Sequence, residues 1–215
     1  MKFPALKAIG LGIGLFLVVY VPAFITVALA RPRIEIAIPV IVVITLPVTL
    51  ILIFLLARPP GGLTEFGFRY SPPRYLTGAT VLGLALGFGL TFLSHLFPSK
   101  PPFDVSSFAP WKIALYFLLG ASIQEEIIFR GLIQSMMARW WKARFSFASG
   151  SCSGAVAFSA ALFGVIHSES GLLVVLSAIV LGLVAGELRR RSGSLLPAII
   201  VHALFNGADA FWGLK

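Results

Sequence analysis

The sequence predicts an all-α protein, a polytopic transmembrane helical bundle that forms one integral membrane domain over residues 1–215. Hydrophobic residues make up 58% of the chain and charged residues only 12%, roughly half the share of about 25% in soluble domains. Apolar stretches of about 20 residues, the length that a helix needs to cross a bilayer, recur along the chain. A backbone in lipid must satisfy its hydrogen bonds internally, which favours helices. This composition excludes an ordinary soluble enzyme, a disordered chain and a basic-patch nucleic-acid binder.

Seven apolar runs are expected to form helical spans. They cover residues 8–30, 36–57, 75–99, 113–138, 145–166, 170–186 and 192–208, the last extending to 214. The first run follows Lys2 and Lys7 and resembles a signal peptide, but it is too long for a signal h-region, and we expect a retained helix. Glycines in the third and sixth runs predict close helix packing: Gly83, Gly87, Gly89, Gly182 and Gly186.

Basic residues in the connections predict the orientation in the membrane. One set of connections carries most of them: Lys2, Lys7, Arg58, Arg69, Arg74, Arg139, Lys142, Arg144, Arg189, Arg190 and Arg191. The opposite set carries Arg31, Arg33, Lys100, Lys112 and Lys215. We therefore expect a cell (inner) membrane protein with a cytoplasmic N-terminus and an outer C-terminus. The net charge of +9 is interpreted as topology and contact with membrane lipid, with no nucleic acid as a partner.

Three charged residues interrupt the fourth run. Glu126 and Arg130 are spaced i, i+4 and can pair on one helix face, whereas Glu125 points about 100° away from Glu126. An ionisable side chain near the bilayer centre costs about 2.5–3.5 kcal/mol on insertion scales. One arginine and two carboxylates leave one negative charge, and a buried carboxylate needs a proton, a metal or another cation. A structural role therefore fits Glu126 with Arg130, and a functional role fits Glu125.

The fifth run ends at His167, and the seventh contains His202 and Asn206 at i, i+4. A glutamate, two histidines and an asparagine on three helices supply a general base, metal ligands and hydrogen-bond donors. Such a set is what hydrolysis by an activated water requires. The only cysteine, Cys152, and Ser159 have no adjacent histidine, and the HExxH motif of zinc proteases is absent. Cys152 is therefore expected to be a buried packing residue.

Three motifs resemble those of a known family. Glu125-Glu126-x-x-x-Arg130, Phe163-x-x-x-His167 and His202-x-x-x-Asn206 occur in this order, on or at the end of the fourth, fifth and seventh apolar runs. They are similar to the motifs of the CPBP intramembrane protease family, which includes CAAX-prenyl endopeptidases and bacteriocin-processing proteins. The resemblance covers about residues 110–213, which would be the catalytic core. Members of that family often have eight spans, so the resemblance allows seven or eight here.

The resemblance implies a membrane endopeptidase that hydrolyses a peptide bond of a membrane-associated substrate in a cavity open to the cytoplasm. Glu125 would activate water with His167, and His202 and Asn206 would hold the oxyanion. Glu126, Arg130 and Phe163 would support the site. A divalent metal, with Zn²⁺ favoured, would use His167, His202 and Glu125. The residues leave two alternatives open: a non-proteolytic immunity or scaffold protein, and a proton-coupled transporter. The oligomeric state and the substrate do not follow from the sequence.

Overall fold

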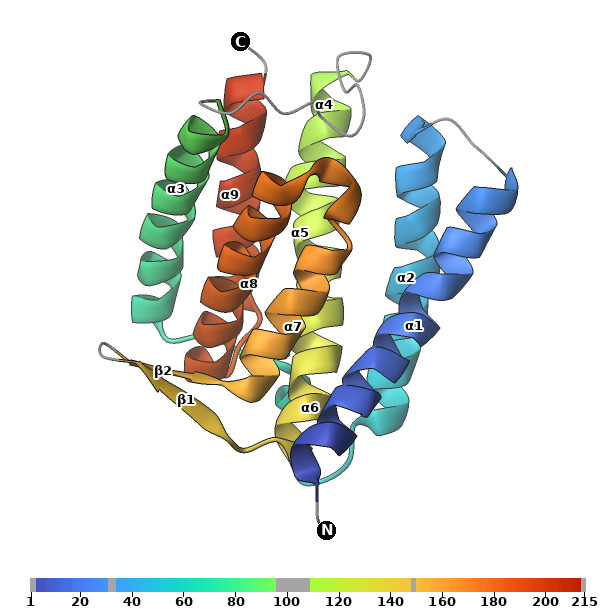
Figure 1. Cartoon of the computed structure of the whole chain (residues 1–215), viewed down its shortest axis with the longest axis vertical. Helices are drawn as coiled ribbons and strands as arrows, with labels where there is room; N and C mark the ends of the chain where they lie inside the picture. The colour runs from blue at the N-terminus through green and yellow to red at the C-terminus, as the bar shows by residue number, and fades with distance from the viewer. Residues whose placement is uncertain (1–2, 31–33, 96–108, 148–149, 214–215) are drawn as a thin grey trace.

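A computed structural model describes residues 3–30, 34–95, 109–147 and 150–213, and it shows a bundle of helices that run between two ends (Figure 1). The N-terminal half contains α1 (Pro4–Ala30), α2 (Ile34–Leu56), the short 3-10 helix η1 (Gly62–Phe66) and α3 (Pro73–His95). The two ends of the chain lie at opposite ends of the bundle (Figure 1). The mainly helical fold confirms the predicted class.

The fourth apolar run forms one long helical column through the middle of the bundle. It consists of α4 (Pro110–Ile113), η2 (Ala114–Ala121), α5 (Ser122–Glu126), η3 (Ile127–Ile133) and α6 (Gln134–Trp140). Of these, η2 and η3 are π-helical. The rest of the chain forms β1 (Arg144–Phe147), β2 (Gly150–Ser153), α7 (Gly154–Val165), the 3-10 helix η4 (Ser168–Ser170), α8 (Leu172–Ser192) and α9 (Leu196–Gly213).

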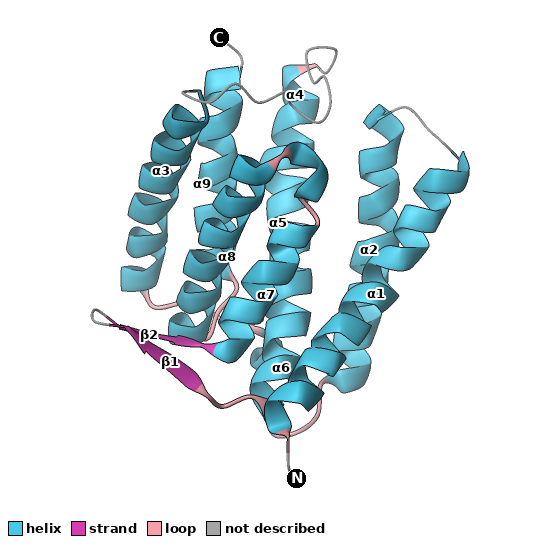
Figure 2. Cartoon of the chain, viewed as in Figure 1, coloured by secondary structure: helices cyan, strands magenta, loops and turns pink. Residues whose placement is uncertain are grey.

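The fifth apolar run is not helical from its start, so the prediction of a helix over 145–166 was wrong in its first part. The run begins with an antiparallel hairpin, β1 and β2, which pairs Arg144 with Ser153 (Figure 2). Phe and Ser alternate in β1, and this period of two suits a strand. The Ser153 hydroxyl then accepts a hydrogen bond from the Val156 N–H and caps α7. Because α7 has only 12 residues, it rises about 18 Å, less than the thickness of a bilayer core.

Four helices in the described ranges are long and apolar enough to cross a membrane: Pro4–Ala30, Ile36–Leu56, Pro73–Leu93 and Leu172–Ser192. The helices Gly154–Val165 and Leu196–Ala208 are apolar but shorter. A total of seven or eight spans therefore stays a prediction. The sixth run also extends further than predicted. Helix α8 continues through Arg189, Arg190 and Arg191 until Gly193, whose φ of 73° ends it in the left-handed conformation.

Close packing at four of the five predicted glycines holds the helices around the column together. A Cβ at Gly83 or Gly87 would lie 2.9 or 2.7 Å from a side chain of α9. A Cβ at Gly182 or Gly186 would lie 2.9 Å from α7 side chains. The prediction was wrong for Gly89, where a Cβ would meet nothing within 4 Å.

The basic connections gather at the end of the bundle where the N-terminus lies (Figure 1). Phe66, from the connection between α2 and α3, is fully buried beneath the helices. Arg139 Nη2 donates to Glu65 Oε2 at 2.7 Å, and Arg189 Nη2 donates to the Glu65 carbonyl at 2.7 Å. Lys7 lies 3.7 Å above the Trp140 ring and joins α1 to α6. The cytoplasmic orientation of this end stays a prediction.

Candidate active site

Two neighbouring glutamates lie in the middle of the helical column, on α5. This helix has only five residues and stands between the π-helical segments η2 and η3. π-Helical turns often occur at functional sites because they change the register of the side chains. The Glu126 side chain is fully buried, whereas that of Glu125 is 17% exposed. The column thus holds one carboxylate in the protein interior and leaves its neighbour accessible.

Glu126 joins the column to α9. Its Oε1 accepts a hydrogen bond from Arg130 Nη1 at 2.7 Å and another from His202 Nδ1 at 2.9 Å. The i, i+4 ion pair of Glu126 with Arg130 was predicted from the spacing and is confirmed. The hydrogen bond between His202 Nδ1 and the buried Glu126 carboxylate fixes the orientation of the imidazole ring. The other ring nitrogen, Nε2, therefore faces away from Glu126.

Glu125 faces the other nitrogen of the same imidazole. Its Oε2 lies 3.8 Å from His202 Nε2, so His202 stands between the two carboxylates. Arg130 neutralises one of the two negative charges. The 3.8 Å between Glu125 and His202 is an ion-pair distance and is too long for a direct hydrogen bond.

His167 follows the end of α7, where the helix stops at Val165. Its Nδ1 lies 2.8 Å from the Phe163 carbonyl oxygen. A carbonyl can only accept a hydrogen bond, so Nδ1 carries the proton and the lone pair is on Nε2. His167 therefore offers the Nε2 lone pair as a hydrogen-bond acceptor, just beyond the end of the short helix α7.

Phe163 is the centre of the group. The His167 ring lies edge-on at 4.8 Å between centroids, and the His202 ring lies edge-on at 5.5 Å. The Arg130 guanidinium lies 4.7 Å from the centroid of the same phenyl ring, a cation–π distance. Three elements thus place their polar residues around one fully buried aromatic side chain. The Phe163 ring therefore contacts both imidazoles, and its supporting role stays a prediction.

Asn206 lies one turn after His202 on α9. Its Nδ2 donates to Ser122 Oγ at 3.2 Å, and Ser122 is fully buried on α5. The four predicted residues, Glu125, His167, His202 and Asn206, thus lie in one region where α5, α7 and α9 meet. Ser122 was not predicted from the sequence, because a single serine in an apolar run does not reveal that its partner is Asn206 of another helix.

Two further polar groups near the column were also missed. Gln124 Nε2 donates to Thr45 Oγ1, a buried contact that ties α5 to α2. Tyr20 of α1 is 4% exposed, and its hydroxyl has no hydrogen-bond partner among the described residues. The only sequence signal for either residue is a polar group in the middle of an apolar run.

Cys152 and Ser159 show no nucleophile geometry. Cys152 lies in β2, and its thiol contacts the Ser153 carbonyl at 3.5 Å. Burial raises the pKa of this thiol, and the charge of Glu187 raises it further. Ser159 Oγ donates to the Phe129 carbonyl of the π-helical segment η3 at 2.9 Å. The thiol therefore contacts the neighbouring backbone carbonyl, and the hydroxyl joins α7 to the backbone of η3.

The predicted metal set is not assembled in this geometry. In the part of the chain that the structure describes, no three His, Cys, Asp or Glu side chains lie together in a way that could hold a metal ion. His202 Nδ1 is already bound to Glu126, and its Nε2 faces Glu125 at 3.8 Å. The residues present do not fit a three-ligand zinc site, and Zn²⁺ stays a prediction from the resemblance.

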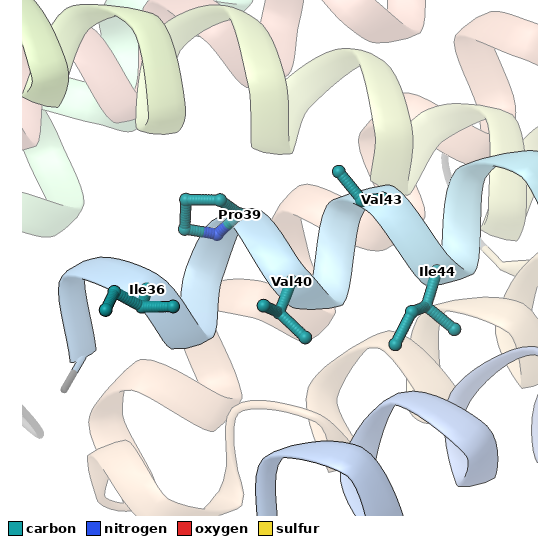
Figure 3. Close-up of a pocket in the computed structure, with 5 residues that line it drawn as sticks. All are labelled: Ile36, Pro39, Val40, Val43 and Ile44. Atoms are coloured by element: carbon teal, nitrogen blue, oxygen red, sulfur yellow. The ribbon is translucent and has the colours of Figure 1, made fainter. Parts of the chain in front are cut away.

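An apolar groove lies apart from these residues, along α2. It is lined by Ile36, Pro39, Val40, Val43 and Ile44 (Figure 3). None of the candidate site residues contributes to this lining. An apolar surface of this kind suits contact with acyl chains.

Comparison with known proteins agrees with the motifs. Neither the curated proteins nor the solved structures contain a significant match to this chain. Residues 106–208 match the family model described as "Type II CAAX prenyl endopeptidase Rce1-like", and this segment includes all four predicted site residues. The match covers just under half of the chain and confirms the predicted resemblance of this segment to a family of CAAX prenyl endopeptidases.

Proposed function

We propose that the chain is an intramembrane endopeptidase of the CAAX-protease type, and that it hydrolyses a peptide bond of a membrane-attached substrate with an activated water. The observation that supports this most is the position of His202 between two glutamates, next to a second imidazole on the same phenyl ring. Bundle packing alone does not require two carboxylates, two imidazoles and an amide in one apolar interior, because each costs desolvation energy.

Glu125 is the proposed general base, because it is the more accessible of the two carboxylates. It takes a proton from the water as the water oxygen bonds to the substrate carbonyl carbon. His167 Nε2 carries a lone pair and accepts the second hydrogen of that water as a hydrogen bond. The two groups together would fix the water for attack.

The carbonyl oxygen then becomes an oxyanion and needs donors. His202 in its doubly protonated form donates Nε2–H, and Glu126 stabilises the positive imidazolium through Nδ1. Asn206, oriented through Ser122, supplies an amide N–H. When the C–N bond breaks, the proton on Glu125 passes to the leaving amine, and the base is restored.

The proposed substrate is a peptide attached to the membrane, approached from the cytoplasmic side. The matched family model is described as a CAAX prenyl endopeptidase, which supports a prenylated CAAX peptide as the proposed substrate class. A lipid anchor would bring the peptide to a protein whose surface is largely apolar. The basic end of the bundle would contact anionic lipid headgroups in the same leaflet.

The test uses the full chain in proteoliposomes with two quenched fluorescent peptides, one farnesylated on a CAAX cysteine and one identical but unmodified. Wild-type protein is expected to cleave the farnesylated peptide. Glu125→Gln should reduce kcat by a factor of about 100 or more, because the amide cannot accept the proton. Cleavage by Glu125→Gln at the wild-type rate would contradict the role of Glu125. Failure of wild-type protein to cleave either peptide, with pH-driven solute flux instead, would favour a transporter.

A further inference from the structure

We propose that Tyr20 is a further residue of the catalytic centre, which positions the attacking water by donating its hydroxyl hydrogen to the water oxygen. This inference rests on the proposed function. Tyr20 lies on α1, outside the segment 106–208 that matches the family model. Its role therefore does not follow from the motifs and has to be argued from its surroundings.

The hydroxyl of Tyr20 is buried and lacks a partner in the described part of the chain. The residue is 4% exposed, and its oxygen is among the buried polar atoms without a hydrogen bond. Leaving a buried hydroxyl unsatisfied costs roughly 1–3 kcal/mol. A tyrosine in a position where phenylalanine would pack equally well therefore points to a group outside the protein that takes its hydrogen bond.

The surroundings identify that group. The Tyr20 ring lies against Phe129, which belongs to the same helical column as Glu125. The charges of Glu125 and Arg130 are close enough to act on the Tyr20 hydroxyl. Its hydroxyl makes no direct hydrogen bond with Glu125, so in this proposal a water molecule bridges the two oxygens. The Glu125 side chain is 17% exposed, so water can reach its carboxylate.

An aromatic chain fixes the Tyr20 ring in this place. The ring lies 5.9 Å from Phe129 and 5.1 Å from Phe16 between centroids. Phe129 in turn lies edge-on to Phe163 at 5.2 Å between ring centroids, and the Phe163 ring contacts the imidazoles of His167 and His202. The ring of Tyr20 thus belongs to the same series of packed aromatic rings as the two histidines. Packing of the ring, rather than a hydrogen bond, holds the hydroxyl in place.

This placement completes the coordination of the proposed water. The water donates one hydrogen to Glu125 and the other to His167 Nε2. Tyr20 donates to one lone pair of the water oxygen, and the second lone pair is left to attack the carbonyl carbon. The proton still goes to Glu125, and Tyr20 remains protonated throughout. It is a positioning residue for the water and does not take part in proton transfer.

The experiment compares Tyr20→Phe with wild-type protein, with Glu125→Gln and with Tyr70→Phe, using the farnesylated quenched peptide in proteoliposomes. Tyr70 is 93% exposed and serves as the control for loss of a hydroxyl. Tyr20→Phe should lower kcat about tenfold, with KM within a factor of two and an unchanged unfolding temperature. Tyr70→Phe should behave as wild type.

A second variant separates positioning from packing. Phe16→Leu disturbs the ring of Tyr20 but keeps its hydroxyl, and it should lower stability more than kcat. The inference is overturned if Tyr20→Phe keeps wild-type kcat, or if its loss of activity is matched by a loss of stability like that of Phe16→Leu. If Glu125→Gln is fully active, the proposed function fails; if Glu125→Gln is inactive and Tyr20→Phe is normal, only the role of Tyr20 fails.

Discussion

Glu126 contacts two ionisable side chains in the protein interior, so its replacement should affect both stability and activity. Its buried carboxylate accepts hydrogen bonds from Arg130 and His202. Replacement of Glu126 by Gln leaves the charge of Arg130 buried and uncompensated, which costs about 3–5 kcal/mol of stability. The same change removes the group that orients His202, so kcat should fall as well. Unfolding in detergent and peptide cleavage measure the two effects.

Glu187 provides the matched control. It also forms ion pairs with two arginines, Arg190 and Arg191, but at the basic end of α8, where the side chains are 22–53% exposed. Glu187→Gln should cost no more than about 1 kcal/mol. In the double variant Glu126→Gln with Arg130→Met, stability should recover in part while kcat stays low. Wild-type stability of Glu126→Gln would contradict the buried pair.

Cys152 allows a prediction about pH. Burial, assisted by the charge of Glu187, raises the pKa of its thiol above the usual range, so the reactive thiolate is scarcer at neutral pH than for an exposed cysteine. Alkylation by a maleimide should therefore be slow at pH 7 and accelerate as the pH rises beyond the ordinary thiol range. A labelling rate at pH 7 equal to that of free cysteine would contradict this environment.

At the scale of elements, the contact of α3 with α9 positions two residues of the site, His202 and Asn206. A Cβ at Gly87 would lie 2.7 Å from Ala208 Cβ and 3.1 Å from the backbone of Phe205. Gly87→Ala should push the helices apart, cost about 1–3 kcal/mol and reduce cleavage. Gly89→Ala, two residues away in open space, should be neutral or stabilising by up to about 1 kcal/mol. Equal effects of the two changes would exclude a role for this helix contact.

The elements also show where reasoning from sequence succeeds. Long apolar runs such as 8–30 and 36–57 become helices close to the predicted bounds, because a lipid-compatible backbone has few other options. The hairpin of β1 and β2 was not foreseen, since its residues are apolar enough to extend the run that follows. The alternation of Phe and Ser was the available signal, and hydropathy averaging hides it.

For the molecule as a whole, the site was predictable as a set of residues but not as an arrangement. Spacing within one helix predicts a pair such as Glu126 with Arg130, because i and i+4 share a face. The position of His202 between the two glutamates depends on how α9 packs against the column, and spacing carries no such information. Tyr20 lies still further away in the chain, on a helix that carries no motif.

The orientation of the bundle follows from its two unlike ends and can be tested with the whole protein. Tyr70, in the connection between η1 and α3, is 93% exposed, and Trp111, on α4, is 62% exposed. The start of α3 and α4 lie at opposite ends of the bundle (Figure 1). In a Cys152→Ser background, Tyr70→Cys and Trp111→Cys each place one accessible thiol at one end. A membrane-impermeant maleimide should label Trp111→Cys in intact spheroplasts and Tyr70→Cys only in inverted vesicles, because basic connections stay in the cytoplasm. The reverse pattern would place the basic end outside the cytoplasm and would contradict the proposed orientation. Labelling of both thiols from the same side would contradict the placement of the two ends on opposite sides of the membrane.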